Sequence, residues 1–323
     1  MSTQDRYFEG RRLDRPGDDI EDQGLAFDLR TMVSRRRVLG IFGIGVGAAA
    51  QAACSPGGTR TASSSTASSA STTTSTNAAA KYAGQELTEL NNETAGPYPG
   101  DGSNGPDILD ESGVERRDLT TSVDGIGSVD GVPMTLMMNL IDITNDNQPL
   151  AGAAVYVWHC NGEGEYSMYS DGVTDQTWLR GVQVTDANGS VTFDSIVPGC
   201  YSGRWPHIHF EVFSSIDEIT DASNSVLTSQ IVVPVEVARA CYDDSAYAGS
   251  LDNLNNITLD TDNVFSDGWD AQTPAVSGSK TAGYQLVIDV PVDITDKTTG
   301  GQPPAGGSGP GQGGPGEGGP GGG

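Results

Sequence analysis

The chain has 323 residues, and its 43 acidic residues against 17 basic ones give a formal net charge of −26. Such a charge repels phosphate backbones and anionic lipid headgroups, so nucleic acid is not expected as a partner, and we attribute the charge mainly to solubility. Both ends are too biased in composition to join a packed core. About two-thirds of the chain is left for folding, which is the size of one domain.

The first segment has the pattern of an export signal. Three arginines at positions 35–37 stand directly before an apolar run, rich in Gly and Ala, that extends from Val38 to about Ala53. This is the layout of a twin-arginine signal, and the run is too short for a comfortable membrane span. We therefore predict that residues 1–54 are a twin-arginine signal region, that the twin-arginine machinery is a partner, and that the protein is extracellular or at the cell surface.

The cysteine at the end of the apolar run leaves two outcomes open. Cys54 stands where a lipoprotein signal places its acylated cysteine, whereas Gln51 departs from the lipoprotein pattern. Both a lipid anchor at Cys54 and plain cleavage after an alanine are compatible with the sequence. The remaining cysteines, Cys160, Cys200 and Cys241, allow one disulfide and one buried thiol in an oxidising compartment, and the sequence does not choose the pair.

Composition divides the rest of the chain. Residues 55–84 are rich in Ser, Thr and Ala, which predicts a flexible linker. Residues 297–323 are mostly Gly and Pro without a strict three-residue period, which predicts a disordered tail and excludes collagen. The folded domain is therefore expected at residues 85–296.

Short strand-like runs dominate this domain. Runs of Val, Ile and Leu broken by Gly, Asn and Asp, with frequent turns, predict an all-β fold, an antiparallel β-sandwich. A turn at residues 145–149 indicates a hairpin between the first two strands, and Asn188-Gly189 indicates a tight turn. The expected strands are residues 134–142, 153–159, 181–185, 190–193, 207–213, 229–235 and 284–290.

Two of the three histidines share one of these strands. His207 and His209 flank Ile208, and residues two apart in a strand lie on the same face. Both imidazoles are therefore expected to point the same way and to be able to bind one metal ion. The preceding loop, rich in Pro, Gly and Ser, returns Tyr201 towards that face. A second glycine-bearing loop, after the 153–159 strand, presents Tyr166.

These motifs resemble the intradiol ring-cleavage dioxygenases, the family of catechol, hydroxyquinol and protocatechuate ortho-cleaving enzymes, and most closely its exported single-domain members. The similarity extends over residues 94–290. It includes the Thr-x-Gly-Pro-Tyr motif at 94–98, the Trp-His-Cys segment at 158–160 and the Pro-Gly-x-Tyr…His-x-His block at 198–209.

The resemblance implies a non-haem Fe(III) cofactor with four protein ligands. Tyr166 and His207 match the family's equatorial ligands, and Tyr201 and His209 match its axial ones. Phenolates suit trivalent iron because they are hard anions, and neutral histidines keep the site from becoming too electron-rich. Tyr201 and His207 are closer in sequence than in the soluble catechol enzymes, so the substrate preferences of those enzymes are not transferred. His159 matches a position that is not a ligand and is expected to be a buried structural histidine.

The same resemblance implies catalytic and substrate-binding residues. Tyr201 would leave the metal when substrate binds, and Arg204 would stabilise negative charge on the ring carbon that oxygen attacks, the alternative for Arg204 being a surface salt bridge. Gln230 matches the family's Thr-Gln-Ile segment and would lie near the same face. A Gly-Pro-Tyr turn is equally compatible with packing and with a substrate mouth; the substrate-binding residues expected are Gly96, Pro97, Tyr98, Arg204 and Gln230.

The expected activity is cleavage of a catechol-type ring between its two hydroxyl-bearing carbons by O2, giving a cis,cis-muconate-type diacid. One alternative is an Fe(II) oxygenase that uses His207, His209 and Glu211, but this leaves both tyrosines unexplained. The other is a surface-tethered sandwich that binds aromatic compounds or metal without catalysis, since a sandwich by itself does not define a function. The sequence fixes neither the preferred catechol nor the oligomeric state.

Overall fold

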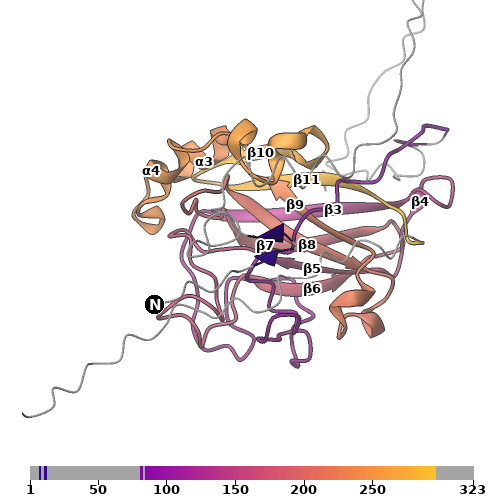
Figure 1. Cartoon of the computed structure of the whole chain (residues 1–323), viewed down its shortest axis with the longest axis horizontal. Coiled ribbons are helices and arrows are strands. Elements are labelled where there is room, and N and C mark those ends of the chain that lie inside the picture. Colours follow the sequence, from indigo (N-terminus) through magenta and orange to yellow (C-terminus); the bar gives the residue numbers. More distant parts are fainter. Residues whose placement is uncertain (1–6, 9–10, 13–80, 83, 296–323) are drawn as a thin grey trace, which may run out of the picture.

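The computed structural model describes residues 7–8, 11–12, 81–82 and 84–295 (Figure 1). Near the start of the chain, β1 (Tyr7–Phe8) pairs with β2 (Arg11–Arg12) in an antiparallel ladder. The rest of the predicted signal region, most of the linker and the Gly/Pro-rich tail lie outside the described residues. Within the described part, no helix is long and apolar enough to span a membrane.

Two β-sheets form the domain. One has the order β10, β11, β3, β4, with β7 also paired to β3, and the other has the order β6, β5, β8, β9. The strands of the first are β3 (Pro133–Asp142), β4 (Gln148–Pro149), β7 (Ser190–Ile196), β10 (Ala275–Ser279) and β11 (Gly283–Val292). Those of the second are β5 (Ala154–Trp158), β6 (Arg180–Val184), β8 (His207–Phe213) and β9 (Leu227–Val232).

The two sheets pack face to face, and the side chains between them form the main core (Figure 1). Leu136 of β3 and Leu286 of β11 are packed in the same cluster as Ile208 and Phe210 of β8. Full burial of such a side chain contributes roughly 1.5–3 kcal/mol. The predicted all-β sandwich is confirmed. All its strand pairings are antiparallel except that of β11 with β3, which is parallel.

Alternation along β8 places its histidines outside this core. Ile208 and Phe210 face the first sheet, so His207 and His209 point to the opposite face of the second sheet. That face is also covered, because a second apolar cluster lies over it. The cluster includes Trp158 and Phe213 of the sheet together with Ala95, Ile108 and Leu109 of the preceding segment. The histidines are therefore enclosed between the sheet and its covering segments.

The predicted hairpin between the first two strands is wrong. β3 makes its hairpin with the short β4, and the chain then crosses to the second sheet, where β5 pairs with β6 and β8. Gly152, with φ of 83°, lies at this crossing, just before β5. A turn pattern shows that the chain reverses but does not show which sheet receives the next strand.

Two expectations about the strands of the C-terminal half of the domain are also wrong. The strand expected at 229–235 ends at Val232, and Val235 begins helix α3, because Pro234 lacks the N–H that would continue the ladder. The strand β10 was not expected at all.

Short helices gather at one end of the sandwich near β10 (Figure 1): α3 (Val235–Cys241), α4 (Ser250–Leu254) and the 3-10 turns Ser245–Tyr247, Leu259–Thr261, Phe265–Asp267 and Asp270–Gln272. Two more 3-10 turns, Ile216–Glu218 and Ala222–Asn224, connect β8 to β9.

The cysteines of the described domain form no disulfide. Cys160, Cys200 and Cys241 are all buried free thiols.

Candidate metal and substrate site

The two histidines of β8 lie side by side. Their Nε2 atoms are 3.1 Å apart, and each residue is 2% exposed. Two nitrogen atoms bound at right angles to one ion, each at about 2.1 Å, would be about 3.0 Å apart. The observed separation therefore fits two neighbouring ligands of a single metal ion.

Neighbouring groups fix the form and orientation of these imidazoles. His207 Nδ1 contacts the carbonyl oxygen of Trp205, which can only accept, so Nδ1 carries the proton and Nε2 presents its lone pair. The ring of Trp158 stacks on His209 with centroids 4.9 Å apart and an interplanar angle of 5°. Burial lowers the pKa of both histidines well below its usual range. Both imidazoles are therefore neutral, which is the form that binds a metal.

Tyr201 reaches the histidines from the loop after β7. It is half-buried, and its hydroxyl is 3.3 Å from Nε2 of His207. Gly164, in the loop that carries Tyr166, packs against it: a Cβ at Gly164 would lie 2.8 Å from Cβ of Tyr201, and φ there is +89°. Glycine at 164 thus permits the two tyrosine-bearing loops to pack against each other.

Tyr166 completes the group from the opposite loop. It is 2% exposed, and its ring centroid lies 5.9 Å from that of Tyr201 and 6.3 Å from that of His209. Burial raises the pKa of Tyr166 well above its usual range, and the neighbouring Tyr201 raises it further. A phenolate at this position therefore requires a strong cation to displace the proton.

The donor set fits a hard trivalent ion. The four side chains offer two phenol oxygens and two imidazole nitrogens, and phenolate oxygen is a hard ligand. In the described part of the chain, no group of three or more His, Cys, Asp or Glu side chains is placed to hold a metal ion. Glu211, farther along β8, is hydrogen-bonded instead to Thr228 Oγ1 at 3.2 Å. The structure thus brings the four predicted ligands together and gives the carboxylate alternative no support.

A buried arginine that the sequence reasoning missed holds the Tyr166 loop. Arg180 is 1% exposed and donates from Nε and Nη2 to the side chain and carbonyl of Ser167, both at 3.0 Å. Its Nη1 donates to the carbonyl of Pro99 at 2.8 Å. Arg180 therefore joins the loop of Tyr166 to the segment that follows Tyr98. This role could hardly be predicted from the sequence, because arginine is seldom fully buried.

The predicted Gly96-Pro97-Tyr98 segment forms a wall beside Tyr166. The ring of Tyr98 lies 4.9 Å from that of Tyr166. Gly96 has φ of +72°, a conformation that favours glycine, and its N–H donates to Thr94 Oγ1 at 3.0 Å. Pro97 and Tyr98 are half-buried, so this segment borders the outer side of the site.

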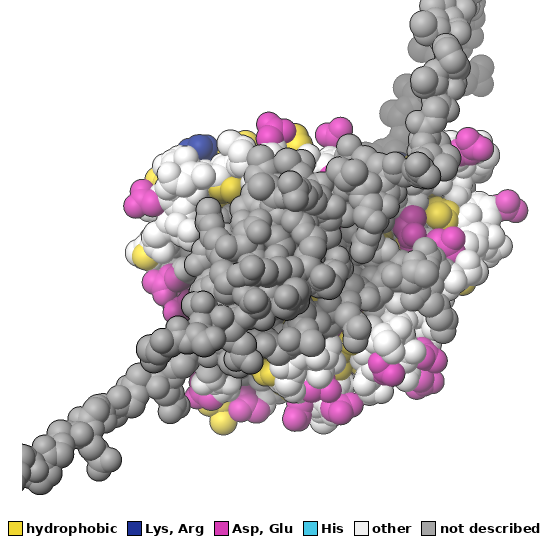
Figure 2. Space-filling view, in the orientation of Figure 1, with side chains coloured by type: hydrophobic (Ala, Val, Ile, Leu, Met, Phe, Trp, Pro, Cys, Tyr) yellow, Lys and Arg dark blue, Asp and Glu magenta, His cyan; other side chains and the backbone are white. Residues whose placement is uncertain are grey.

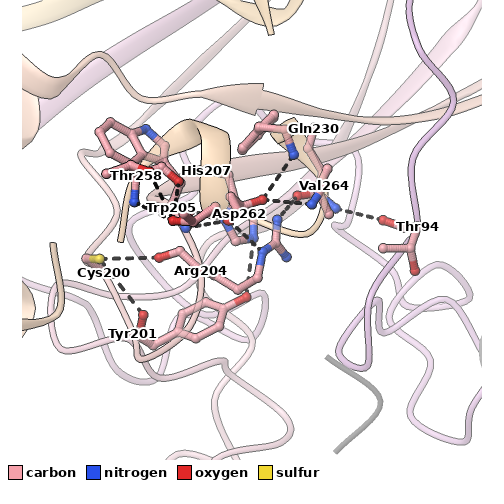
Figure 3. Close-up of polar contacts among 12 residues, drawn as sticks. Thr94, Cys200, Tyr201, Arg204, Trp205, His207, Gln230, Thr258, Asp262 and Val264 are labelled. Atoms are coloured by element: carbon pink, nitrogen blue, oxygen red, sulfur yellow. Dashed lines mark hydrogen bonds and ion pairs between the residues drawn. The ribbon is translucent and has the colours of Figure 1, made fainter. Parts of the chain in front are cut away.

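Arg204 and Gln230 are joined to each other at the same face (Figure 3). Arg204 is 1% exposed, and its Nη2 donates to Gln230 Oε1 at 2.6 Å. Gln230 stands opposite His209 in the ladder of β8 and β9 and donates to the carbonyl of Thr94 at 2.9 Å. The salt bridge of Arg204 is to the fully buried Asp262, at 3.0 Å. The surface salt-bridge alternative for Arg204 is therefore wrong.

His159 lies apart from this group, as a structural histidine would. It is buried, and its ring nitrogens are 2.8 Å from Ser195 Oγ and from the carbonyl of Cys160. With both nitrogens engaged, it has no lone pair to offer a metal.

Comparisons with known proteins point to the family that the motifs resemble. A family model described as Dioxygenase matches residues 103–221, the range that holds all four candidate ligands and Arg204. A chlorocatechol 1,2-dioxygenase of Rhodococcus opacus is 29% identical over 119 residues, or 27% of this chain and 46% of that protein. A catechol 1,2-dioxygenase 2 of Acinetobacter lwoffii is 40% identical over 68 residues, or 21% of this chain and 24% of that protein.

A solved structure agrees in fold. The crystal structure of the dioxygenase Tetur07g02040 aligns with a TM-score of 0.52 and 21% identity, covering 65% of this chain and 96% of that one. Together with the matched family model, these relatives support the intradiol ring-cleavage dioxygenase family that the motifs resemble. It aligns with less than half the length of the two sequence relatives named above.

Proposed function

We propose that this protein is an exported, ferric intradiol dioxygenase that opens a catechol-type ring between its two hydroxyl-bearing carbons with O2 and yields a cis,cis-muconate-type diacid. The observation that carries the proposal is the convergence of two tyrosines and two neutral histidines at one enclosed point next to a buried arginine. The similarity to intradiol dioxygenases supports the same chemistry.

The ion would be held by Tyr166, Tyr201, His207 and His209. When bound, Fe(III) would serve as a Lewis acid and template that makes a chelated catecholate reactive towards O2. Tyr201 is the half-buried member of the four, so it is the ligand best placed to move as substrate enters. Its phenolate oxygen can then accept a proton from a substrate hydroxyl.

The side chains around the four candidate ligands would stabilise charge on the substrate ring and restrict water. The guanidinium of Arg204 remains protonated at any working pH, so it offsets negative charge on the ring without a proton transfer. Trp158 packs against His209 on the inner side of the site, and Tyr98 packs against Tyr166 on its outer side, so both restrict the access of water. A dry site strengthens these electrostatic interactions.

The Fe(II) alternative is weakened by the position of its carboxylate. Glu211 is hydrogen-bonded to Thr228 Oγ1 at 3.2 Å, and within the described residues it forms no metal-binding group with the two histidines. Colour separates the two proposals, because tyrosinate coordinated to Fe(III) absorbs visible light strongly, whereas an Fe(II) site of histidines and carboxylate is nearly colourless.

The proposed export route rests on the sequence. The paired arginines within positions 35–37 and the apolar run to about Ala53 support the twin-arginine machinery, which carries folded proteins and so permits iron loading before export. Anchoring by a lipid at Cys54 and release after cleavage remain the two alternatives for the mature form.

An oxygen-electrode screen tests the proposed activity. Iron-loaded protein is assayed with catechol, hydroxyquinol and protocatechuate, and the same protein stripped of iron and reloaded with Zn²⁺ is the control. We expect oxygen uptake with at least one catechol in the iron form and none in the zinc form. Absence of uptake by fully loaded ferric protein with every catechol would contradict the proposal.

A further inference from the structure

One buried carboxylate accepts hydrogen bonds both from the Arg204 guanidinium and from the backbone just before β8. Asp262 is fully buried, and its Oδ2 accepts hydrogen bonds from Arg204 Nε at 3.0 Å and from the Trp205 N–H at 2.6 Å (Figure 3). Its Oδ1 accepts from the N–H groups of Val264 and Phe265 at 2.9 and 3.1 Å. Asp262 lies beyond the residues that the family model matches, in the helical segment at one end of the sandwich.

These contacts restrict the guanidinium of Arg204. Asp262 engages its Nε edge, while Gln230 engages Nη2 at 2.6 Å, so contacts at two separate positions define the plane of the group. An arginine side chain otherwise has many accessible rotamers, and fixing them has a large entropic cost. The negative charge of Asp262 also allows the arginine to stay charged in a buried position, where an unpaired cation would be strongly destabilised.

The same carboxylate fixes the peptide that orients the imidazole of His207. Trp205 donates its N–H to Asp262, and its carbonyl oxygen accepts the Nδ1 proton of His207. The indole Nε1 of Trp205 donates to the carbonyl of Val233 at 3.0 Å, which holds the residue from its other end. Asp262 therefore links the position of Arg204 to that of His207.

We infer that Asp262 is a positioning residue of this site, which aims the Arg204 guanidinium at the reacting ring. Its contact with the Trp205 N–H can be kept by the amide oxygen of an asparagine, so Asp262→Asn tests the contact with Arg204. This inference rests on the proposed function for its catalytic consequence. The coupling between Asp262 and Arg204 does not, because the ion pair exists in the protein without substrate.

The coupling is tested first on iron-free protein, by thermal unfolding of Arg204→Leu, Asp262→Asn and the double variant. Each single change leaves one buried partner uncompensated, so each should lower the melting temperature by at least about 6 °C. The double variant should lose clearly less than the sum of the two. The exposed Asp260→Asn is the matched control and should melt within about 1 °C of the unchanged protein. Additive losses in the double variant would overturn the inference.

The positioning role is tested next on iron-loaded protein. We expect Asp262→Asn to keep its iron and its visible absorption, to keep KM within about threefold, and to lose roughly tenfold to a hundredfold in kcat per iron. The double variant should be no slower than Arg204→Leu alone. Independent, multiplicative losses in kcat, or a normal kcat per iron in Asp262→Asn, would refute the positioning role.

A second variant guards against a failure of Asp262→Asn to fold. Asp262→Glu keeps the charge but moves the carboxylate by one methylene, and we expect a lower kcat per iron with KM and iron content retained; an unchanged kcat would refute the role. Inactivity of the unchanged ferric protein would count against the proposed function, and the unfolding experiment on iron-free protein would still decide the ion-pair coupling.

Discussion

Tyr201 differs from the other candidate ligands in its exposure. It is half-buried, whereas Tyr166, His207 and His209 are each 2% exposed. A ligand at the border of the site has room to turn away, while a ligand enclosed by packed side chains does not. If the four side chains hold the proposed ion, Tyr201 is the one suited to exchange and the other three are suited to holding it.

Replacing this tyrosine tests that separation. Tyr201→Phe should keep part of its iron through the other three ligands, shift the visible absorption band and lower kcat per iron by at least about a hundredfold, because one phenolate ligand and base is lost. Iron analysis, visible spectra and oxygen uptake measure these effects. Tyr284→Phe, a tyrosine of β11 away from the site, is the control. Unchanged colour and turnover in Tyr201→Phe would remove Tyr201 from the site.

The environment of Glu93 leads us to expect that the stability of the fold depends on pH. Glu93 lies beside Gln272, which is hydrogen-bonded to the carbonyl of Gln230, the partner of Arg204. Glu93 Oε1 is 3.3 Å from Gln272 Nε2, and burial, with a smaller contribution from Asp267, raises its pKa from 4.5 to about 8. The folded protein therefore binds this proton more tightly than the unfolded chain. The resulting stability is fully present below pH 4.5 and is lost as the pH rises towards about 8.

Unfolding midpoints at pH 5, 6, 7 and 8 measure this effect. Between the two extremes the unchanged protein should lose on the order of 5 °C more than Glu93→Gln, which has no proton to release. The exposed Glu111→Gln serves as control and should follow the unchanged protein. Parallel curves for Glu93→Gln and the unchanged protein would show that Glu93 ionises normally in the fold.

Among the structural elements, β8 was predicted best. Its period of two assigns Ile208 to the core and the histidines to the opposite face, and local geometry alone is sufficient for that. The partners of each strand were less predictable, because pairing depends on contacts far apart in the sequence. The same applies to Arg180 and Asp262, which both resemble ordinary surface charges in the sequence and acquire their roles only from segments that the fold brings to them.

Arg180 connects two segments of the fold, so its replacement should affect both. Its hydrogen bonds join the loop after β5 to Pro99. Arg180→Met keeps the length of the side chain but leaves buried acceptors of Ser167 and Pro99 without a donor, which should cost about 3 kcal/mol in free energy of unfolding. It should also weaken iron retention, since Tyr166 lies in the loosened loop. Urea unfolding and iron content after dialysis measure both.

Arg117→Met is the matched control for this experiment. Its guanidinium pairs with Asp194 at the surface, with side-chain exposures of 59% and 44%, so its loss should cost no more than about 1 kcal/mol. Equal stability of the two variants would mean that Arg180 does not hold the loop.

On the scale of the whole molecule, the surface is dominated by negative charge. Asp and Glu side chains appear at many separate points of the described surface in Figure 2, and Lys or Arg far more rarely. This distribution agrees with the formal charge of −26, which is expected to repel polyanions.

The proposed export also belongs to the whole chain. Replacing Arg35 and Arg36 together by Lys should leave the folded protein in the cytoplasm, because the twin-arginine machinery reads the paired arginines. Fractionation of cells that produce the two forms, with a cytoplasmic enzyme as marker for lysis, measures the outcome. Unchanged appearance of the variant outside the membrane would show that another signal directs export.

The most direct measurement of the central claim is the product formed from catechol and ¹⁸O₂ by the iron-loaded protein, identified by mass spectrometry. An intradiol enzyme joins both atoms of one O2 to the two carbons that carried the hydroxyls. We therefore predict cis,cis-muconate that contains two heavy oxygen atoms at early turnover. A semialdehyde from cleavage beside the hydroxyl-bearing carbons, a quinone, or a diacid without both labels would contradict the account.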